Sequence, residues 1–194
     1  MKRLIAVVAA LAVIVMIVGG CASPEQRAQK LFDEGKYQEV LDKYADQPIA
    51  KQAREGLAAK MVTEGKFQEV IDNFGDTPAA QDAKNKRAEQ LLAEKKYDEI
   101  LQKFPNTPSA NVARSAVAEG LYAEKKIDEL VMKYPNTPAG VKARNELAKE
   151  EFDKLMKKPK KDRKKLYEEF LKNPKYAGTE SAMAAQKELA GAPK

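Results

Sequence analysis

The chain carries a repeating pattern of apolar and polar positions with a period of 30 residues. Four segments align without a gap, the first of them starting at Glu34: EGKYQEVLDKYADQP, EGKFQEVIDNFGDTP, EKKYDEILQKFPNTP and EKKIDELVMKYPNTP. In the first segment Tyr37, Val40, Leu41 and Tyr44 follow the i, i+3, i+4, i+7 spacing of one face of an α-helix. A fixed period of this length is typical of stacked structural repeats.

A second helix is predicted before each of these segments. Leu57, Ala58, Met61 and Val62 share one face of such a helix. Alanine recurs at one position of this helix in five units, at residues 28, 58, 88, 118 and 148. Because a small side chain lets a neighbouring helix come close, each unit is predicted to be a pair of packed helices.

Turn-forming residues mark the boundaries of the predicted helices. Gly35 and Gly65 fit the left-handed position that ends a first helix, whereas Lys95 and Lys125 replace them in the later units. Those two later turns therefore need either some strain or another geometry. A threonine N-cap followed by proline in the first turn is typical of a helix start, and it occurs at residues 77–78, 107–108 and 137–138.

The period breaks after Phe152, which still aligns with Tyr122. The next aromatic residue is expected at position 157, but the matching pattern begins at Tyr167. The insertion lies around residues 154–165, where eight residues are basic and one is acidic. It is interpreted either as a solvated helix extension with a kink at Pro159 or as a surface for anionic lipid headgroups or an acidic partner. The residues of that surface are Lys157, Lys158, Lys160, Lys161, Arg163, Lys164 and Lys165.

The first 20 residues have the layout of an export signal. Lys2 and Arg3 precede an unbroken apolar stretch over residues 4–18. The following residues resemble the bacterial lipobox, and the resemblance implies cleavage before Cys21 and lipid attachment to its sulfur. The residues of the motif before the cysteine are Val18, Gly19 and Gly20. Ala22 implies, by the sorting rule of Gram-negative lipoproteins, the outer membrane.

An uncleaved transmembrane anchor with an incidental cysteine is the alternative interpretation of this segment. Both interpretations place the rest of the chain outside the cytoplasm, because the basic residues stay inside. This location argues against nucleic acid as a partner, although the chain has a net charge of +6. The charge is also local, since residues 141–194 hold 15 Lys and Arg and 9 Asp and Glu.

The residue types needed for several kinds of catalysis are missing from the sequence. The chain has no histidine and one cysteine, which excludes histidine-based triads, histidine zinc sites and an intramolecular disulfide. Glutamates recur at positions 39, 69, 99 and 129, where their period indicates solvated faces or i,i+4 partners of lysine. We therefore expect no enzymatic activity, no cofactor and no metal.

Residues 23–190 resemble tetratricopeptide-repeat proteins in their predicted helix pairs, the small residue of the first helix, the aromatic residue closing the second and the proline between units. The phrases FPNTPSA and KYPNTPAG are similar to envelope proteins of this class, including outer-membrane assembly lipoproteins of the BamD type and the Tol–Pal coordinator. The resemblance implies an all-α fold: an α-solenoid of about five helix hairpins plus a C-terminal capping helix over residues 21–194. Its units of 30 residues are shorter than the usual 34 or so.

Stacked hairpins form a groove lined by their first helices. By resemblance to tetratricopeptide grooves, the lining here is expected to include Gln52, Glu55, Asn85, Glu89, Ser115, Glu119, Tyr122, Asn145 and Lys149. The sequence thus predicts a lipid-anchored envelope adaptor that binds an envelope protein or peptide segment, in outer-membrane assembly or maintenance. The alternative is an accessory subunit or weak hydrolase that acts on the cell wall.

Overall fold

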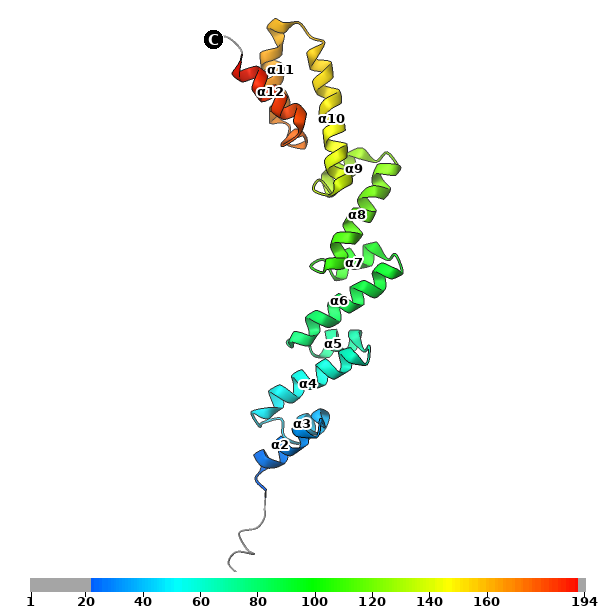
Figure 1. Ribbon diagram of the computed structural model, residues 1–194, viewed down its shortest axis with the longest axis vertical. Coiled ribbons are helices and arrows are strands. Elements are labelled where there is room, and N and C mark those ends of the chain that lie inside the picture. Colours follow the sequence, from blue (N-terminus) through cyan, green and yellow to red (C-terminus); the bar gives the residue numbers. More distant parts are fainter. Residues whose placement is uncertain (1–21, 192–194) are drawn as a thin grey trace, which may run out of the picture. The chain divides into compact units, whose positions relative to one another are not determined.

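The computed structural model describes residues 22–191, and this part of the chain is all-α, without a β-strand (Figure 1). The predicted fold class is confirmed at this level. The helices are α2 (Pro24–Asp33), α3 (Tyr37–Lys43), α4 (Ile49–Thr63), α5 (Phe67–Asn73), α6 (Pro78–Ala93), α7 (Tyr97–Lys103), α8 (Pro108–Ala123), α9 (Ile127–Lys133), α10 (Pro138–Met156), α11 (Lys160–Lys172) and α12 (Glu180–Ala190). A 3-10 turn, η1 (Pro174–Tyr176), lies between the last two.

In chain order the described helices form five pairs followed by α12. The second helix of each of the first four pairs has 7 residues, about two turns. The order of long and short helices along the described chain matches the predicted helix boundaries. By its contacts the chain divides into two compact units between Lys86 and Arg87, inside α6. The first unit holds α2 to α5 and the start of α6, and the second unit holds the rest.

After each of the second to fifth pairs, a threonine hydroxyl forms a hydrogen bond in the turn that leads to the next helix. The hydroxyl donates to the carbonyl three residues earlier, at 2.7 Å for Thr77, 2.8 Å for Thr107, 2.8 Å for Thr137 and 2.7 Å for Thr179. The Thr137 hydroxyl also accepts a hydrogen bond from the Gly140 amide at 3.2 Å, as expected of an N-cap. These bonds fix the turn at which the chain passes from one pair to the next.

The turn inside each of the first four pairs uses one left-handed residue. Its φ is +70° at Gly35 and +78° at Gly65. Lys95 and Lys125 take the same conformation with φ of +58°. The later turns therefore keep the glycine geometry with a lysine, and each carries the cost of placing a Cβ there.

Alanine and β-branched or aromatic residues build the core of the first unit. Ala28 and Ala58, which belong to the predicted alanine row, have no exposed surface. Val40 and Val70 of the short helices are equally buried. The ring of Tyr37 lies against Gly56 of α4, where an added Cβ would come within 2.8 Å of it. Larger side chains of the short helices thus pack against small residues of the long helices.

The second unit repeats this packing and ends in an aromatic cluster. Ala118 and Ala148 are fully buried, as is Leu130 of α9. Beyond them, the ring centroid of Phe152 lies 5.8 Å from that of Tyr167 and 6.0 Å from that of Phe170. The longer last pair is therefore held together by rings contributed by both α10 and α11.

The insertion around residues 154–165 forms the turn of a helix hairpin. α10 ends at Met156, and α11 starts at Lys160 and runs back beside α10 (Figure 1). Pro159 is the N-cap of α11, so the interpretation of this stretch as one helix kinked at Pro159 is wrong. The physical reason is that Tyr167 and Phe170 are buried only when α11 folds back onto α10. The added residues lengthen both helices of the fifth pair.

Candidate functional site

All nine predicted groove residues lie on the first helices of the pairs, α4, α6, α8 and α10. Four of them occupy the same position of successive repeats and are all polar and half-buried: Glu55, Asn85, Ser115 and Asn145. One turn further along, Glu89, Glu119 and Lys149 are exposed. Gln52, Glu55 and Asn85 belong to the first unit, and the other six to the second.

Within the second unit, Tyr122, one of the predicted groove residues, contacts two charged side chains of α10. Its hydroxyl donates to the Glu146 carboxylate at 2.8 Å. The Lys142 ammonium lies 4.7 Å from the centroid of its ring, as in a cation–π contact. Sequence reasoning missed Glu146 and Lys142, because neither aligns with Tyr122 in the 30-residue period. The contacts with Glu146 and Lys142 fix the orientation of the Tyr122 ring between α8 and α10 and place polar groups around it.

Ser115 borders a hollow of about 330 Å³ in the second unit. Asn111 and Arg114 of α8 lie on one side, and Tyr134 and Pro135 of the turn after α9 lie on the other. Arg114 donates to the Asn111 side chain at 2.7 Å and to the Pro105 carbonyl at 2.6 Å. The guanidinium is thus held by the fold, and the hollow offers polar side chains beside an aromatic ring.

The periodic acids act as helix-surface ion pairs. Lys43, Lys103 and Lys133 lie 2.9, 2.8 and 2.8 Å from Glu39, Glu99 and Glu129, one turn earlier. Position 73 is asparagine, so Glu69 has no equivalent lysine. Lysine partners at i,i+4 are therefore found for three of these glutamates, and Glu69 is exposed, as the solvated-face alternative expects. The lysine partners lower the pKa of Glu99 and of Glu129 by hydrogen bonding and by their charge.

A second row of ion pairs crosses the turns inside the helix pairs. Each joins a glutamate to the lysine two residues later, with N–O distances of 2.7 Å for Glu34–Lys36, 2.8 Å for Glu64–Lys66, 2.6 Å for Glu94–Lys96 and 2.6 Å for Glu124–Lys126. The hydrogen bond from lysine, followed by its charge, lowers the pKa of Glu34 and of Glu64. Sequence reasoning missed these pairs, although the Glu-x-Lys spacing recurs in all four repeats.

The predicted basic surface occupies the turn between α10 and α11 and the start of α11. We call its five lysines without an ion pair to any described residue the basic tip: Lys157, Lys158, Lys160, Lys161 and Lys164. Lys165 differs, since its ammonium lies 3.9 Å from the Glu169 carboxylate. Arg163 also differs, because it donates to the Lys158 carbonyl at 2.8 Å and to the Met156 carbonyl at 2.6 Å.

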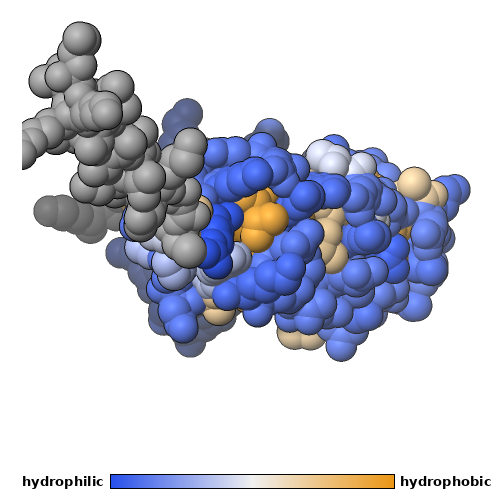
Figure 2. Space-filling model, turned by 90° about the horizontal axis from the view of Figure 1, so that it is seen from below, coloured by the Kyte–Doolittle hydropathy of each residue, from blue (hydrophilic) through white to orange (hydrophobic). Residues whose placement is uncertain are grey.

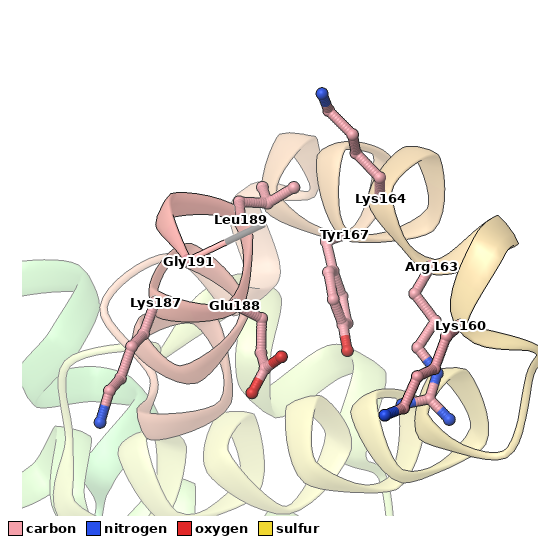
Figure 3. Close-up of a pocket in the computed structure, with 8 residues that line it drawn as sticks. All are labelled: Lys160, Arg163, Lys164, Tyr167, Lys187, Glu188, Leu189 and Gly191. Carbon is pink, nitrogen blue, oxygen red and sulfur yellow. The ribbon is translucent and has the colours of Figure 1, made fainter. Parts of the chain in front are cut away.

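A hollow of about 480 Å³ opens beside the basic tip, between α11 and α12 (Figure 3). Lys160 and Arg163 lie on the α11 side, and Lys187 and Glu188 on the α12 side. Figure 3 shows the Tyr167 hydroxyl and the Glu188 carboxylate directed into the space between the helices. The hollow therefore combines positive charge with one carboxylate.

The face drawn in Figure 2 is mainly hydrophilic. In the face drawn in Figure 2, hydrophobic residues show only in small patches. Among the residues that the structure describes, no group of three or more Asp, Glu, Cys or His could hold a metal ion. Over residues 22–191, no helix is both long and apolar enough to span a membrane. Cys21 and the lipobox residues Val18, Gly19 and Gly20 lie outside the described range.

Comparison of the chain with protein-family models, with curated proteins and with solved structures gives no match.

Proposed function

We propose that this protein is a lipid-anchored adaptor of the bacterial cell envelope that binds a protein partner through the first helices of its repeats. In this proposal the helix pairs stack as an α-solenoid related to tetratricopeptide repeats, and α12 caps the last apolar face. The partner is an envelope protein or an extended peptide segment, and the process is outer-membrane assembly or maintenance.

The observation that carries the proposal is the polar row on the first helices. Glu55, Asn85, Ser115 and Asn145 recur every 30 residues and are half-buried, while the alanines beside them are fully buried. A half-buried polar side chain can exchange water for a partner's polar groups at a small desolvation cost. Within the second unit, Ser115 and Asn145 lie on the contacting helices α8 and α10, so they offer an extended segment hydrogen-bonding side chains on two consecutive first helices.

The anchor is supported by the order of residues at the start of the chain. A basic start, an apolar stretch and small residues precede the single cysteine of the chain. Acyl chains on Cys21 would hold the adaptor at a membrane, since two chains suffice for stable anchoring. The mature chain would then face the periplasm from the outer membrane.

The binding function is tested by paired substitution within the polar row. Asn85→Ala with Asn145→Ala is expected to reduce recovery of the partner after crosslinking in membranes and purification, because two hydrogen-bonding side chains are lost. The matched control is Gln68→Ala with Gln102→Ala, which changes exposed amides on the short helices α5 and α7. Full recovery of the same partners by the asparagine variant would contradict the proposed binding face.

The anchor has a separate test. Cys21→Ser is expected to abolish lipid attachment and cleavage before residue 21, so the chain keeps its precursor mass. Processing and membrane association identical to those of the unchanged protein would exclude a lipid on this cysteine.

A further inference from the structure

The basic tip concentrates positive charge that the fold itself does not neutralise. Elsewhere in the described chain, many lysines face an acid at close range, as in the Glu34–Lys36 and Glu129–Lys133 pairs at 2.7 and 2.8 Å. The five lysines of the basic tip fall within a stretch of eight residues, and none of them has such a partner among the described residues. Asp162 is the one acid in this stretch. One carboxylate offsets only part of this charge, so solvent ions or an external anionic surface must relieve most of the mutual repulsion at the tip.

The backbone of the tip is nevertheless fixed. Arg163 bridges the carbonyls of Met156 and Lys158 at 2.6 and 2.8 Å. The Tyr167 hydroxyl donates to the Met156 sulfur at 3.0 Å, and Tyr167 itself is only 4% exposed. The hairpin therefore holds the lysines together as one cluster. Because folding has already brought these charges together, binding costs no further backbone conformational entropy for this step.

The side-chain chemistry of the tip favours a diffuse anionic surface over a folded protein partner. Arg163, the one arginine of this stretch, already donates to two backbone carbonyls. The basic side chains left to bind a partner surface are therefore lysines. Lysine is a mobile point charge, whereas arginine provides the planar fork that matches single carboxylates or phosphates. Protein–protein interfaces are enriched in aromatic residues and arginine and depleted of lysine, and the aromatic residue nearest the tip, Tyr167, is buried.

The neighbouring hollow does not change this assignment. Its lining includes the Glu188 carboxylate beside Lys160 and Lys187, and Figure 3 shows that carboxylate directed into the space. A single small anion in the hollow would meet this negative charge. Lys160 and Lys164 border the hollow, whereas Lys157, Lys158 and Lys161 of the basic tip are not among its lining residues. The attraction is therefore carried by the exposed cluster as a whole and not by a site inside the hollow.

We propose that the basic tip docks the C-terminal part of the protein onto the headgroups of an anionic phospholipid membrane. Lysines near such a surface each contribute a favourable electrostatic term that decays within a Debye length. The inference goes beyond the adaptor function and requires neither the partner nor the lipid on Cys21. Together with the proposed anchor, it would give the chain a second membrane contact.

The test measures cosedimentation of a chain that begins at Ala22 with lipid vesicles. This chain keeps all the described helices, and its fully buried residues lie between Ala28 and Ala185. It is expected to bind phosphatidylglycerol-containing vesicles at low salt and to bind pure phosphatidylcholine vesicles far more weakly. Replacing the five lysines of the basic tip by glutamine is expected to reduce the affinity at least about a hundredfold.

A control variant of equal charge separates the tip from the overall charge of the chain. It replaces five other exposed lysines by glutamine: Lys51, Lys60, Lys95, Lys125 and Lys172. This variant is expected to retain most of the binding, and a Lys→Arg variant of the tip is expected to retain it too. Circular dichroism verifies that all variants stay helical.

Three outcomes would overturn the inference. The unchanged chain fails to bind anionic vesicles at low salt; or the tip and control variants lose equal affinity; or polyglutamate binds at the tip while vesicles do not. The last outcome would assign the tip to an acidic protein partner. None of these results bears on the polar row of the first helices, so the adaptor proposal stands or falls separately.

Discussion

Two glycines in long helices of the second unit face opposite surroundings. A Cβ on Gly140, in the first turn of α10, would collide with the carbonyl oxygen of Tyr134. A Cβ on Gly120, near the end of α8, would meet no atom within 4 Å. The close approach at Gly140 lets the chain turn sharply from α9 into α10.

This contrast predicts opposite effects of the same substitution. Gly140→Ala is expected to lower the free energy of unfolding by about 1–3 kcal/mol, because backbone atoms must move to admit the methyl group. Gly120→Ala is expected to raise it by roughly 0.5–1 kcal/mol through better helix propensity. Urea unfolding followed by circular dichroism measures both, and equal signs would contradict this account of the turn.

The left-handed lysines give a second prediction at the residue scale. Lys95→Gly and Lys125→Gly are each expected to stabilise the chain by roughly 1 kcal/mol, because glycine adopts a positive φ without steric cost. Gly35→Ala is the reverse substitution and is expected to destabilise it by a similar amount. Thermal unfolding compares the three variants, and lower stability of both lysine variants would refute the strain at these turns.

The ion pairs across the turns predict a dependence of stability on pH. Lys66 lowers the pKa of Glu64 below its ordinary value of 4.5, so this carboxylate adds stability above that pH and loses it as the pH falls through its folded-state pKa. Glu64→Gln is therefore expected to lower Tm slightly near neutral pH and not at strongly acidic pH. In a Lys66→Gln background the same substitution is expected to leave Tm unchanged at both, whereas a persistent difference would rule out the pair as its source.

At the scale of the helices, each of the two units contains buried alanines at regularly repeated positions of its long helices. Residues 58, 88, 118 and 148 are fully buried, and so is a second row at 53, 83, 113 and 143. The first row is evident from the sequence, whereas burial in the structure identifies the second. Helices that meet across methyl groups have little room for adjustment.

Overpacking of this contact is therefore expected to be costly. Ala118→Leu is predicted to destabilise the chain by about 1–3 kcal/mol, because the added atoms have no space between the helices. Ala123→Leu, at the exposed end of the same helix α8, is expected to change the stability little. The midpoints of urea unfolding of the two variants measure the difference, and equal midpoints would show that the row does not limit packing.

The helix pairs were predictable because each repeat carries its own helical spacing and turn residues. The path of the chain through the insertion was not predictable, since a proline within a basic stretch is compatible with either a kink or a new helix start. Contacts between distant residues decide it: Phe152 packs against Tyr167, and Arg163 holds the carbonyl of Met156. The partners of Tyr122 were missed for a similar reason, because Glu146 is 24 residues away and outside the 30-residue period.

At the scale of the whole molecule, the net charge of +6 is concentrated after residue 140. In the sequence, Cys21 precedes the described helices, the polar row follows on α4, α6, α8 and α10, and the basic tip comes after the row, in the second unit. We propose that a lipid on Cys21 and the basic tip contact a membrane by different chemistry, and that the repeats between them in the sequence bind a partner.

Site-specific photocrosslinking in cells tests the adaptor claim most directly. A photoreactive residue is placed at Ser115 or Asn145 of the polar row, and at Gln68 or Gln102 of the short helices as a control. The account predicts crosslinking to the same discrete envelope protein from both polar-row positions and from neither control position. No crosslinked protein at the polar row, or equal crosslinking from all four positions, would contradict it.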